Sequence, residues 1–423
     1  MKLKLNLFLA LPALFLLFNL QANAFSTASQ DSTVDNCIAC HQDNDNMPDN
    51  YNPEDIHYKV GLSCFNCHGG NPKTEDEDAA MDPDKGFLGA PSKEEIPAFC
   101  GRCHSDFAFM QQYRSEVETD QESQYYTSQH GTLLKKGDTK VAVCSNCHTA
   151  HSIFSPNDPR SSVYPANLPE TCNACHGDAE YMKDYSIPTN QYKLYKTSVH
   201  GIDLYEKHDM SAPVCNDCHG NHGARPPELN SIPRICGSCH VKNLNYFSSS
   251  PMGKEMEEEE IHTCETCHGY HDIQKASDDF IGTGEKSFCI ECHDEGDEGY
   301  ITAAFIKSRI DTLKLKYSTA SDDMNNVIIK GMDDIDISFK LKEARQKLIE
   351  TRTAIHSFDT SQVNTIASQG IKLSNEAIGM AQKEMDEYYN RRTGFIYSSI
   401  ALLILGLALY LKIRTKNGKD KKA

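Results

Sequence analysis

Residues 198–201 read Ser-Val-His-Gly, and residues 214–222 read Val-Cys-Asn-Asp-Cys-His-Gly-Asn-His. The five letters Cys-X-X-Cys-His occur nine times in the 423-residue chain, and these pentads use all eighteen cysteines. The pentad is the attachment motif of c-type haem, in which two thiols join one porphyrin and the adjacent imidazole binds the iron. The sequence therefore predicts nine covalent haems.

The pentads supply two sets of predicted haem-binding residues. The predicted thioether links are at Cys37, Cys40, Cys64, Cys67, Cys100, Cys103, Cys144, Cys147, Cys172, Cys175, Cys215, Cys218, Cys236, Cys239, Cys264, Cys267, Cys289 and Cys292. The predicted proximal iron ligands are His41, His68, His104, His148, His176, His219, His240, His268 and His293.

A disulfide framework or a set of zinc sites would also use many cysteines. A disulfide framework gives no reason for a histidine directly after every second cysteine. Zinc sites pair two cysteine clusters at roughly 12 to 20 residues without requiring that histidine. Haem attachment is therefore the prediction for all nine pentads.

A two-haem repeat runs along the chain. Two copies, with first pentads at Cys144 and Cys215, have a His-Gly pair before that pentad and a further histidine three residues after it. A third copy starts at Cys264, and an earlier, more diverged copy starts at Cys64 and has Asn71 in place of the later histidine. Fixed repetition of this kind indicates an array built by stacking one module.

The repeat also separates distal iron ligands from other histidines. A low-spin electron-transfer haem needs a second axial ligand, usually histidine or methionine. Histidines at recurring positions, together with the one seven residues before Cys64, are the predicted distal ligands. They are His57, His130, His151, His200, His222 and His271.

The third copy lacks the leading histidine, because Ser-Pro-Met-Gly at 250–253 stands where the other copies have histidine followed by glycine. Met252 and His262 are the two candidates for the distal ligand of this haem. A thioether ligand raises a haem's potential relative to two imidazoles. His262 lies two residues before Cys264, so it has little slack to reach across its own porphyrin but can serve a neighbouring haem.

Between Cys37 and His293 the chain spends about 29 residues per haem, too few to bury a conventional core around each one. The porphyrins themselves must form the core. The predicted fold class is therefore a mostly irregular and α-helical multihaem array, followed by an α-helical hairpin stalk and one transmembrane helix.

The stalk prediction rests on apolar residues at three and four spacing in the cysteine-free region. Helices are expected from Tyr300 to about Met324, from Asp336 to about His356 and from Ser361 to about Arg392, packed as a hairpin or three-helix bundle. His356, at the end of the second helix, is a third candidate distal ligand besides Met252 and His262. The alternative is an ordinary surface or partly buried histidine.

The two ends of the chain carry apolar segments. Two lysines, an apolar run and Ala-Asn-Ala at 22–24 fit a secretory signal, and the apolar run 394–411 fits a membrane span. Six basic residues follow that span, so its tail is expected in the cytoplasm and the haem region in the periplasm, anchored to the bacterial inner membrane. The predicted domains are 1–24 signal peptide, 25–298 nonahaem domain, 299–393 helical stalk, 394–411 transmembrane helix and 412–423 basic tail.

The formal net charge is −18, and two propionates on each haem would add to it. Nucleic acid and anionic lipid head groups are therefore poor partners, whereas a basic redox protein would be attracted. One membrane helix offers no haem b bundle, so a separate quinol dehydrogenase is expected as the electron donor.

Residues 196–201 and 215–222, with Ile-Pro-Ala-Phe-Cys-Gly-Arg-Cys-His at 96–104, resemble the multihaem cytochromes c of the doubled Cys-X-X-Cys-His, cytochrome c3/c554-like group. The resemblance covers about residues 37–293, and the stalk with its anchor resembles membrane-attached members. It implies bis-histidine haems that relay electrons between the quinone pool and periplasmic or outer-membrane acceptors. Met252 departs from the pattern.

Two functions remain in competition at this point. The first is an electron conduit without substrate chemistry, because six-coordinate irons leave no position for a substrate. The second is a multihaem oxidoreductase with one five-coordinate haem, similar to nitrite reductases or hydroxylamine oxidoreductases. No pentad ends in lysine, which favours the conduit, whereas a shortage of distal ligands near Met252 or Cys37 would favour the enzyme. A polymerising wire fits the repeats but not the anchor.

Overall fold

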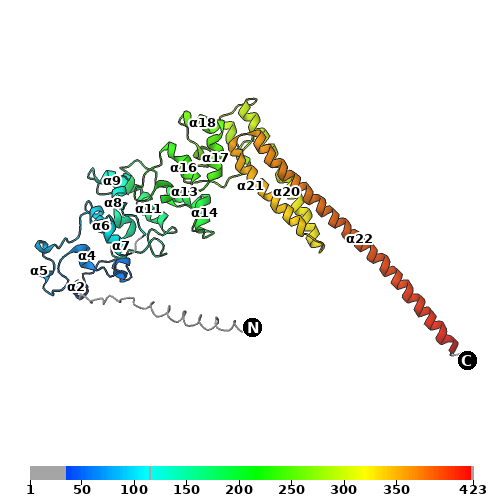
Figure 1. Cartoon of the computed structure of the whole chain (residues 1–423), viewed down its shortest axis with the longest axis horizontal. Coiled ribbons are helices and arrows are strands. Elements are labelled where there is room, and N and C mark those ends of the chain that lie inside the picture. The colour runs from blue at the N-terminus through cyan, green and yellow to red at the C-terminus, as the bar shows by residue number, and fades with distance from the viewer. Residues whose placement is uncertain (1–34, 114–115, 421–423) are drawn as a thin grey trace, which may run out of the picture. The chain divides into compact units, whose positions relative to one another are not determined.

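The computed structural model describes residues 35–113 and 116–420, and for residues 416–420 only the backbone (Figure 1). The predicted signal peptide, 1–24, lies outside these residues. The chain forms two compact units, the first reaching Asn167 and including 222–224, the second comprising 168–221 and the chain from Arg225 onward. This division falls inside the region 25–298, which the sequence predicted as one haem domain.

The first compact unit consists of short helices joined by irregular segments, and none of its described residues lies in a strand. Its helices are α2 (Asn36–Asp43), α3 (Ile56–Lys59), α4 (Cys64–His68), α5 (Glu77–Ala80), η1 (Pro83–Lys85), α6 (Ile96–His104), α7 (Phe107–Gln112), α8 (Gln121–Tyr125), α9 (Gln129–Leu134) and α10 (Cys144–His148).

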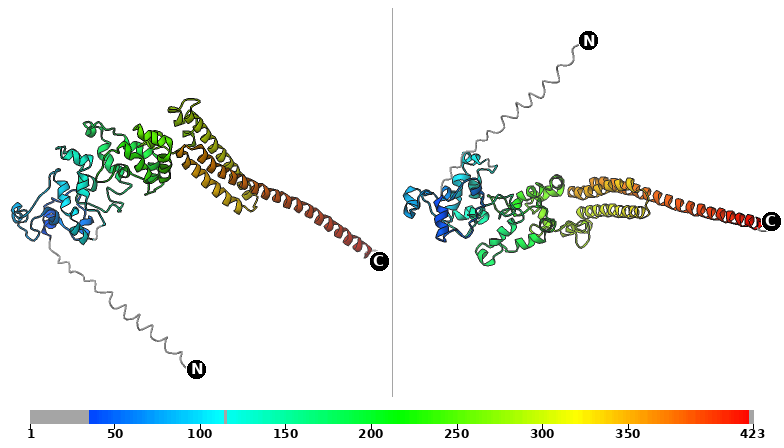
Figure 2. Two further views of the ribbon diagram at one scale, coloured as in Figure 1. Left: turned by 45° about the horizontal axis from the view of Figure 1, so that its top comes forward. Right: turned by 90° about the horizontal axis from the view of Figure 1, so that it is seen from below.

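The second compact unit begins, like the first, with short helices joined by irregular segments, and it ends in three long helices (Figure 2). Its short helices are α11 (Leu168–His176), α12 (Ala179–Met182), α13 (Gln191–Thr197), α14 (Val199–Tyr205), α15 (Cys215–His219), η2 (Leu229–Ser231), α16 (Ile232–Gly237), α17 (Val241–Ser249), α18 (Pro251–Glu258), α19 (Cys264–His268), η3 (Asp278–Phe280) and η4 (Phe288–Glu291). Its long helices are α20 (Glu298–Ile329), α21 (Ile335–Ala354), followed by η5 (Ile355–Ser357), and α22 (Thr360–Asp420).

The first pentad of each repeat forms a helix of its own, five residues long, in α4, α10, α15 and α19. The residue after each of these helices has a positive φ: 71° at Gly69, 66° at Thr149, 82° at Gly220 and 74° at Gly269. This conformation ends a helix at once and suits glycine. The chain therefore turns away directly after the proximal histidine.

The second pentad of three repeats lies at or near the end of a longer helix, in α6, α11 and α16. Each of these helices starts with an Ile-Pro or Leu-Pro pair, at residues 96, 168 and 232. Proline is favoured in the first turn, where its missing N–H leaves no hydrogen bond unmade. Pro97 and Pro169 are fully buried, so they also fix how these helices pack.

Apolar side chains form only small clusters in the haem region. Tyr125, Leu134 and Val143 make up most of one cluster, and Leu204 and Val214 most of another. The two clusters use equivalent positions of the repeat, next to the leading helix and the first pentad. Such small cores agree with the prediction that the porphyrins supply most of the buried surface.

Helices α20, α21 and α22 pack against one another as a bundle, which is the predicted three-helix stalk. Its core is mostly apolar, with Thr351 and Ser374 as buried polar members, and its fully buried apolar residues are Ile310, Leu313, Ala320, Val327, Ala344, Ala354, Val363, Ala367, Ala377 and Ala381. Asp359 caps α22, since its carboxylate accepts from the N–H groups of Ser361 and Gln362. Together with the irregular haem region, the bundle confirms the predicted fold class.

Helix α22 runs without a break through the predicted third stalk helix and the predicted membrane span (Figure 1). Its segment Thr360–Thr415 is the one helix among the described residues that is long and apolar enough to cross a membrane, with a mean hydropathy of 2.1 over its most apolar window. No residue of that window is buried against the rest of the chain.

Candidate haem array

Six proximal histidines each face a second imidazole ring within the described residues. The pairs, with the distance between ring centroids, are His57–His104 (6.0 Å), His68–His151 (6.1 Å), His148–His222 (6.1 Å), His200–His240 (6.4 Å), His219–His271 (5.9 Å) and His268–His356 (6.3 Å). Each pair joins the histidine of one pentad to a histidine outside the pentads.

This separation fits one iron between each pair of rings. Two imidazole nitrogens that bind one metal at about 2 Å each put the ring centroids about 6 Å apart. Direct stacking of two rings would bring their faces closer together. The side chains present therefore fit c-type haem, with the pentad histidine as proximal and the other histidine as distal ligand.

Burial lowers the pKa of several of these imidazoles and so favours the neutral form that a metal requires. Burial, with smaller contributions from His222 and His104, lowers the pKa of His148 to about 4. Burial is also the main cause that lowers the pKa of His222, His268 and His356. A neutral ring offers one nitrogen lone pair to the metal without first losing a proton.

Hydrogen bonds at Nδ1 orient several of these rings. The Nδ1 of His68 lies 2.8 Å from the carbonyl oxygen of Gly89, and that of His356 lies 3.0 Å from the carbonyl of Thr353. A carbonyl oxygen only accepts, so Nδ1 carries the proton and Nε2 keeps its lone pair. Such contacts to the second nitrogen are typical of metal-binding histidines.

Asp55 orients His57 in a different way. Its carboxylate accepts from the His57 N–H at 2.8 Å, lies 3.0 Å from the His57 Nδ1, and accepts from the Ile153 N–H at 2.6 Å. Asp55 is only 2% exposed. The plane of His57 is turned 84° from that of His104, whereas the other five pairs lie within 14–29° of parallel.

The pairs follow a fixed order that the sequence did not predict. We call residues 57, 130, 200 and 252 the leading positions, and residues 71, 151, 222 and 271 the trailing positions. A leading histidine faces the second pentad of its own repeat, as His57 faces His104 and His200 faces His240. A trailing histidine faces the first pentad of the repeat before it, as His222 faces His148.

The four leading positions share one local structure. Each lies two residues after an N-cap whose side chain accepts a backbone hydrogen bond, namely Asp55, Ser128, Ser198 and Ser250. In the last three, the glycine after the leading position packs so closely on a carbonyl of the preceding helix that a Cβ there would overlap it. Met252 therefore has the same backbone setting as His200.

Backbone hydrogen bonds hold each leading position beside the next trailing position. The N–H of Ile56 donates to the carbonyl of Ile153 at 2.8 Å, and the N–H of Val199 donates to that of Ile273 at 2.8 Å. An equivalent bond joins residues 129 and 224. The fourth leading position follows Pro251, which has no N–H and needs no such partner.

The cysteines place consecutive pentads side by side within each compact unit. The thiols of Cys100 and Cys144 lie close enough to shift each other's pKa, and so do those of Cys172 and Cys215. Cys236 and Cys264 form a third such pair. All eighteen cysteines are free of disulfides. Among the described residues, no three His, Cys, Asp or Glu side chains converge on a metal-ion site of the zinc type.

The remaining candidates are placed as follows. His130 occupies the leading position of α9, and its role as a distal ligand stays a prediction. His262 is 61% exposed with its Nδ1 2.7 Å from Glu265, and it faces no proximal histidine. His208 is exposed in a loop with φ 55°. The order of leading and trailing histidines along the sequence is the signal that could have predicted which pentad each distal histidine faces.

Comparison with known families agrees with this geometry. Residues 56–176 match the family model of cytochrome c3. The match covers less than a third of the chain and contains four complete pentads. No solved structure matches the chain. The match confirms the resemblance to multihaem cytochromes c, and the chain is a multihaem electron-transfer cytochrome with covalently bound haems.

Proposed function

We propose that this chain is a nonahaem cytochrome that relays electrons from haem to haem on the periplasmic side of the bacterial inner membrane. The observation that carries the proposal is the set of six facing histidine pairs, each with room for one iron. Haem supplies the one-electron chemistry when bound. The chain supplies two axial nitrogens to each of these irons, which leaves no position for a substrate.

The order of the pentads supports a relay. Within each compact unit, pentads that follow one another in the sequence also have neighbouring cysteines, as Cys100 and Cys144 do. Within a unit, such a linear order would keep each transfer step short, because each cofactor would have its sequence neighbours beside it. The acidic net charge of −18 favours a basic redox protein as one partner.

The membrane anchor supports the proposed location. Helix α22 carries the exposed apolar segment, and six basic residues follow position 411. Basic residues favour the cytoplasmic side, so the haem region would face the periplasm. A quinol dehydrogenase is the proposed donor and a periplasmic or outer-membrane protein the proposed acceptor. Oxidation of a menaquinol analogue by the purified protein alone would contradict the need for that donor.

Met252, rather than His262, is the proposed distal ligand of the haem at Cys289 and Cys292. Met252 has the backbone setting of His200, and the leading position of a repeat serves the second pentad of that repeat. His262 instead points its Nδ1 at Glu265 in an exposed position. A thioether ligand would make this haem the most oxidising of the array.

Two measurements test the proposal. Mass analysis of the exported protein should show nine haems, and low-temperature electron paramagnetic resonance should show mostly bis-histidine low-spin iron. The variant Met252→His should lower one reduction potential by on the order of 100 mV, a fraction of the roughly 0.8 V that axial ligands span. The matched variant His262→Ala should leave all potentials in place. Fewer than nine haems would end the nonahaem proposal.

A further inference from the structure

The first pentad differs from the six paired pentads in what surrounds its histidine. The Nδ1 of His41 lies 3.1 Å from the carbonyl oxygen of Asn46, so Nε2 keeps its lone pair as in the other proximal histidines. Within the described part of the chain, no imidazole faces the His41 ring. The proximal side of this site therefore resembles that of the paired pentads, whereas its distal side has no facing imidazole among the described residues.

The order of ligands explains why a distal histidine is missing here. The pentad at Cys37 comes directly before the first pentad of the Cys64 repeat. Elsewhere in the chain, the pentad in this place is the second pentad of the preceding repeat. A second pentad receives its distal ligand from a leading position well before it in the sequence, as His57 precedes Cys100 and His200 precedes Cys236. Residues 25–36, the segment between the predicted cleavage site and Cys37, contain no histidine, methionine or lysine.

Asn71 fits the same order. It holds the trailing position of the Cys64 repeat, and trailing positions serve the first pentad of the repeat before. Residues 25–36 contain no such pentad, so a histidine at position 71 would have no iron to bind. The Asn71 N–H donates to the carbonyl of Ala80 at 2.9 Å, which joins the loop after α4 to the end of α5.

The nearby methionines, Met47 and Met81, do not occupy a leading position and so do not replace the missing distal histidine. Met47 directly follows Asn46, whose carbonyl lies at Nδ1 of His41. Met81 caps α5 and follows Ala80, the partner of Asn71. Neither residue has the N-cap setting shared by the four leading positions.

We infer that the haem at Cys37 and Cys40 has His41 as its only protein ligand, and that its open axial position takes a small uncharged lone-pair donor. The charges around the pentad select this ligand class. Residues 35–49, which flank the pentad in the sequence, contain four aspartates and no lysine or arginine. Such surroundings oppose anions such as cyanide or nitrite and tolerate neutral molecules such as carbon monoxide or nitric oxide. The inference rests on the proposed nine-haem array.

Carbon monoxide titration of the fully reduced, full-length protein is the direct test. We expect about one carbon monoxide per chain at saturation and one high-spin iron in the oxidised protein, out of nine haems counted by mass. Cyanide at equal concentration should bind at least tenfold more weakly than to a neutral five-coordinate haem such as that of myoglobin. A full set of nine haems with no high-spin iron and no carbon monoxide binding would overturn the inference without touching the haem count.

Paired variants assign the binding haem. Cys37→Ala with Cys40→Ala should remove one haem by mass and abolish carbon monoxide binding. The matched control, Cys289→Ala with Cys292→Ala at the other end of the array, should remove one haem and keep that binding. Loss of binding only in the control would overturn the inference.

A second set of variants keeps the test decisive if the cysteine variants do not fold. Met47→Leu and Met81→Leu should each leave the number of high-spin irons unchanged. A new high-spin signal in either variant would show that the methionine is a ligand and would overturn the inference.

Discussion

Asp55 shows how one side chain can set both the fold and the chemistry of a haem site. It caps α3, holds the backbone at Ile153 and contacts the Nδ1 of His57. The other three leading positions have serine in place of Asp55, and serine cannot offer a charge to the ring. A carboxylate at Nδ1 makes an imidazole a more basic ligand.

Asp55→Ser is therefore predicted to raise the potential of the haem at Cys100 while the helix cap is retained. If the variant site prefers ferric over ferrous iron tenfold less strongly, the reduction potential of this haem rises by about 59 mV, because the couple transfers one electron. We also expect the resonance signal of the perpendicular pair to move toward that of the near-parallel pairs. Asp76→Ser, which changes the cap of α5 away from the histidines, is the control and should leave the potentials unchanged. Equal shifts in both variants would contradict the role given to Asp55.

The stalk is an element that contributes to the haem array rather than a spacer alone. His356, at the end of α21, faces His268 and so takes the trailing role for the Cys264 repeat. Apolar contacts of Tyr246 and Ile281 with Ile306 and Val363 dock the bundle on the haem region. A bidentate pair between Arg352 and Asp278, with both distances 2.7 Å, adds a charged contact.

Docking of the stalk is predicted to weaken in acid. Burial opposes the charged form of Asp278, but hydrogen bonds from Arg352 and Lys314 outweigh it and hold its pKa below 3.8. A carboxylate with a lowered pKa stabilises the folded state above its unfolded value, and this contribution disappears as the pH falls through the folded value. The haem at Cys264 should therefore turn partly high-spin below about pH 4.

Asp278→Asn should reproduce that loss at neutral pH, because the amide cannot form the charged pair. The spin state of the haem at Cys264, followed by absorption and resonance spectroscopy, measures the effect. Lys340→Met is the control, since its pair with Glu376 is half-exposed and surface pairs contribute about 0–1 kcal/mol. An unchanged spin state in Asp278→Asn would mean that apolar packing alone holds His356.

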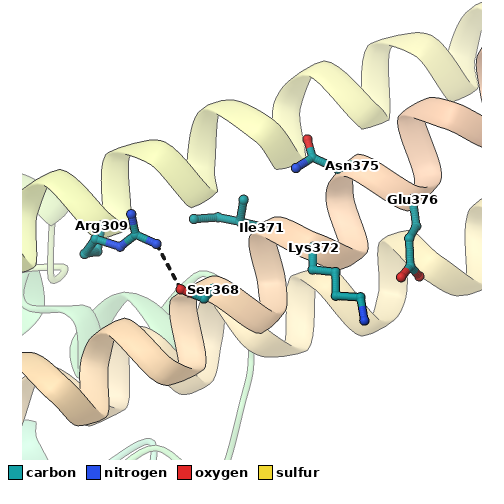
Figure 3. A pocket seen from close by; sticks show the side chains of 6 residues that line it. All are labelled: Arg309, Ser368, Ile371, Lys372, Asn375 and Glu376. Atoms are coloured by element: carbon teal, nitrogen blue, oxygen red, sulfur yellow. Dashed lines mark hydrogen bonds between the residues drawn. The ribbon is translucent and has the colours of Figure 1, made fainter.

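Gly370 lies where α22 packs tightly on both α20 and α21. A Cβ at this position would lie 2.8 Å from the Leu313 side chain and 2.9 Å from the Cβ of Lys347. Figure 3 shows the shallow groove that starts beside it, where Arg309 on α20 donates to the Ser368 hydroxyl on α22 at 3.0 Å. The absence of a side chain at 370 lets α22 contact both neighbours.

Gly370→Leu is predicted to destabilise the bundle by about 1–3 kcal/mol, the usual cost of overpacking a core. Gly379→Leu is a matched control on the same helix, because no atom lies within 4 Å of a Cβ there. The control should stabilise by up to about 1 kcal/mol, since leucine favours a helix over glycine. Thermal unfolding followed by circular dichroism compares them. Equal stability of the two variants would contradict the close packing at 370.

At the scale of the whole molecule, the array and the anchor are separable. The apolar window of α22 buries nothing against the rest of the chain, whereas Ala377 and Ala381 before it belong to the bundle core. A chain that ends at Arg392 should therefore be released into the soluble periplasmic fraction with all its haems. Cell fractionation and haem staining measure this. A truncated protein that stays in the membrane fraction would show that another part of the chain binds there.

The pentads, the repeat and the helical stalk could be predicted from sequence because each rests on local chemistry. A pentad binds its porphyrin through residues that are adjacent in the chain, and helical periodicity depends on neighbours three and four positions apart. The N-cap at Asp359 and the boundary of α21 are signals of the same local kind. The predictions of export and of a membrane span rest on segment composition.

The pairing of each distal histidine with its pentad was decided by tertiary structure. His222 faces His148, 74 positions earlier in the numbering, and His356 reaches His268 from a separate helical bundle. Sequence periodicity carries no information about which distant segments meet, because backbone bonds such as that of Ile56 to Ile153 form only after the repeats have stacked. The candidate iron ligands can thus be read from the sequence, and the packing of one repeat on the next decides which pentad histidine each candidate faces.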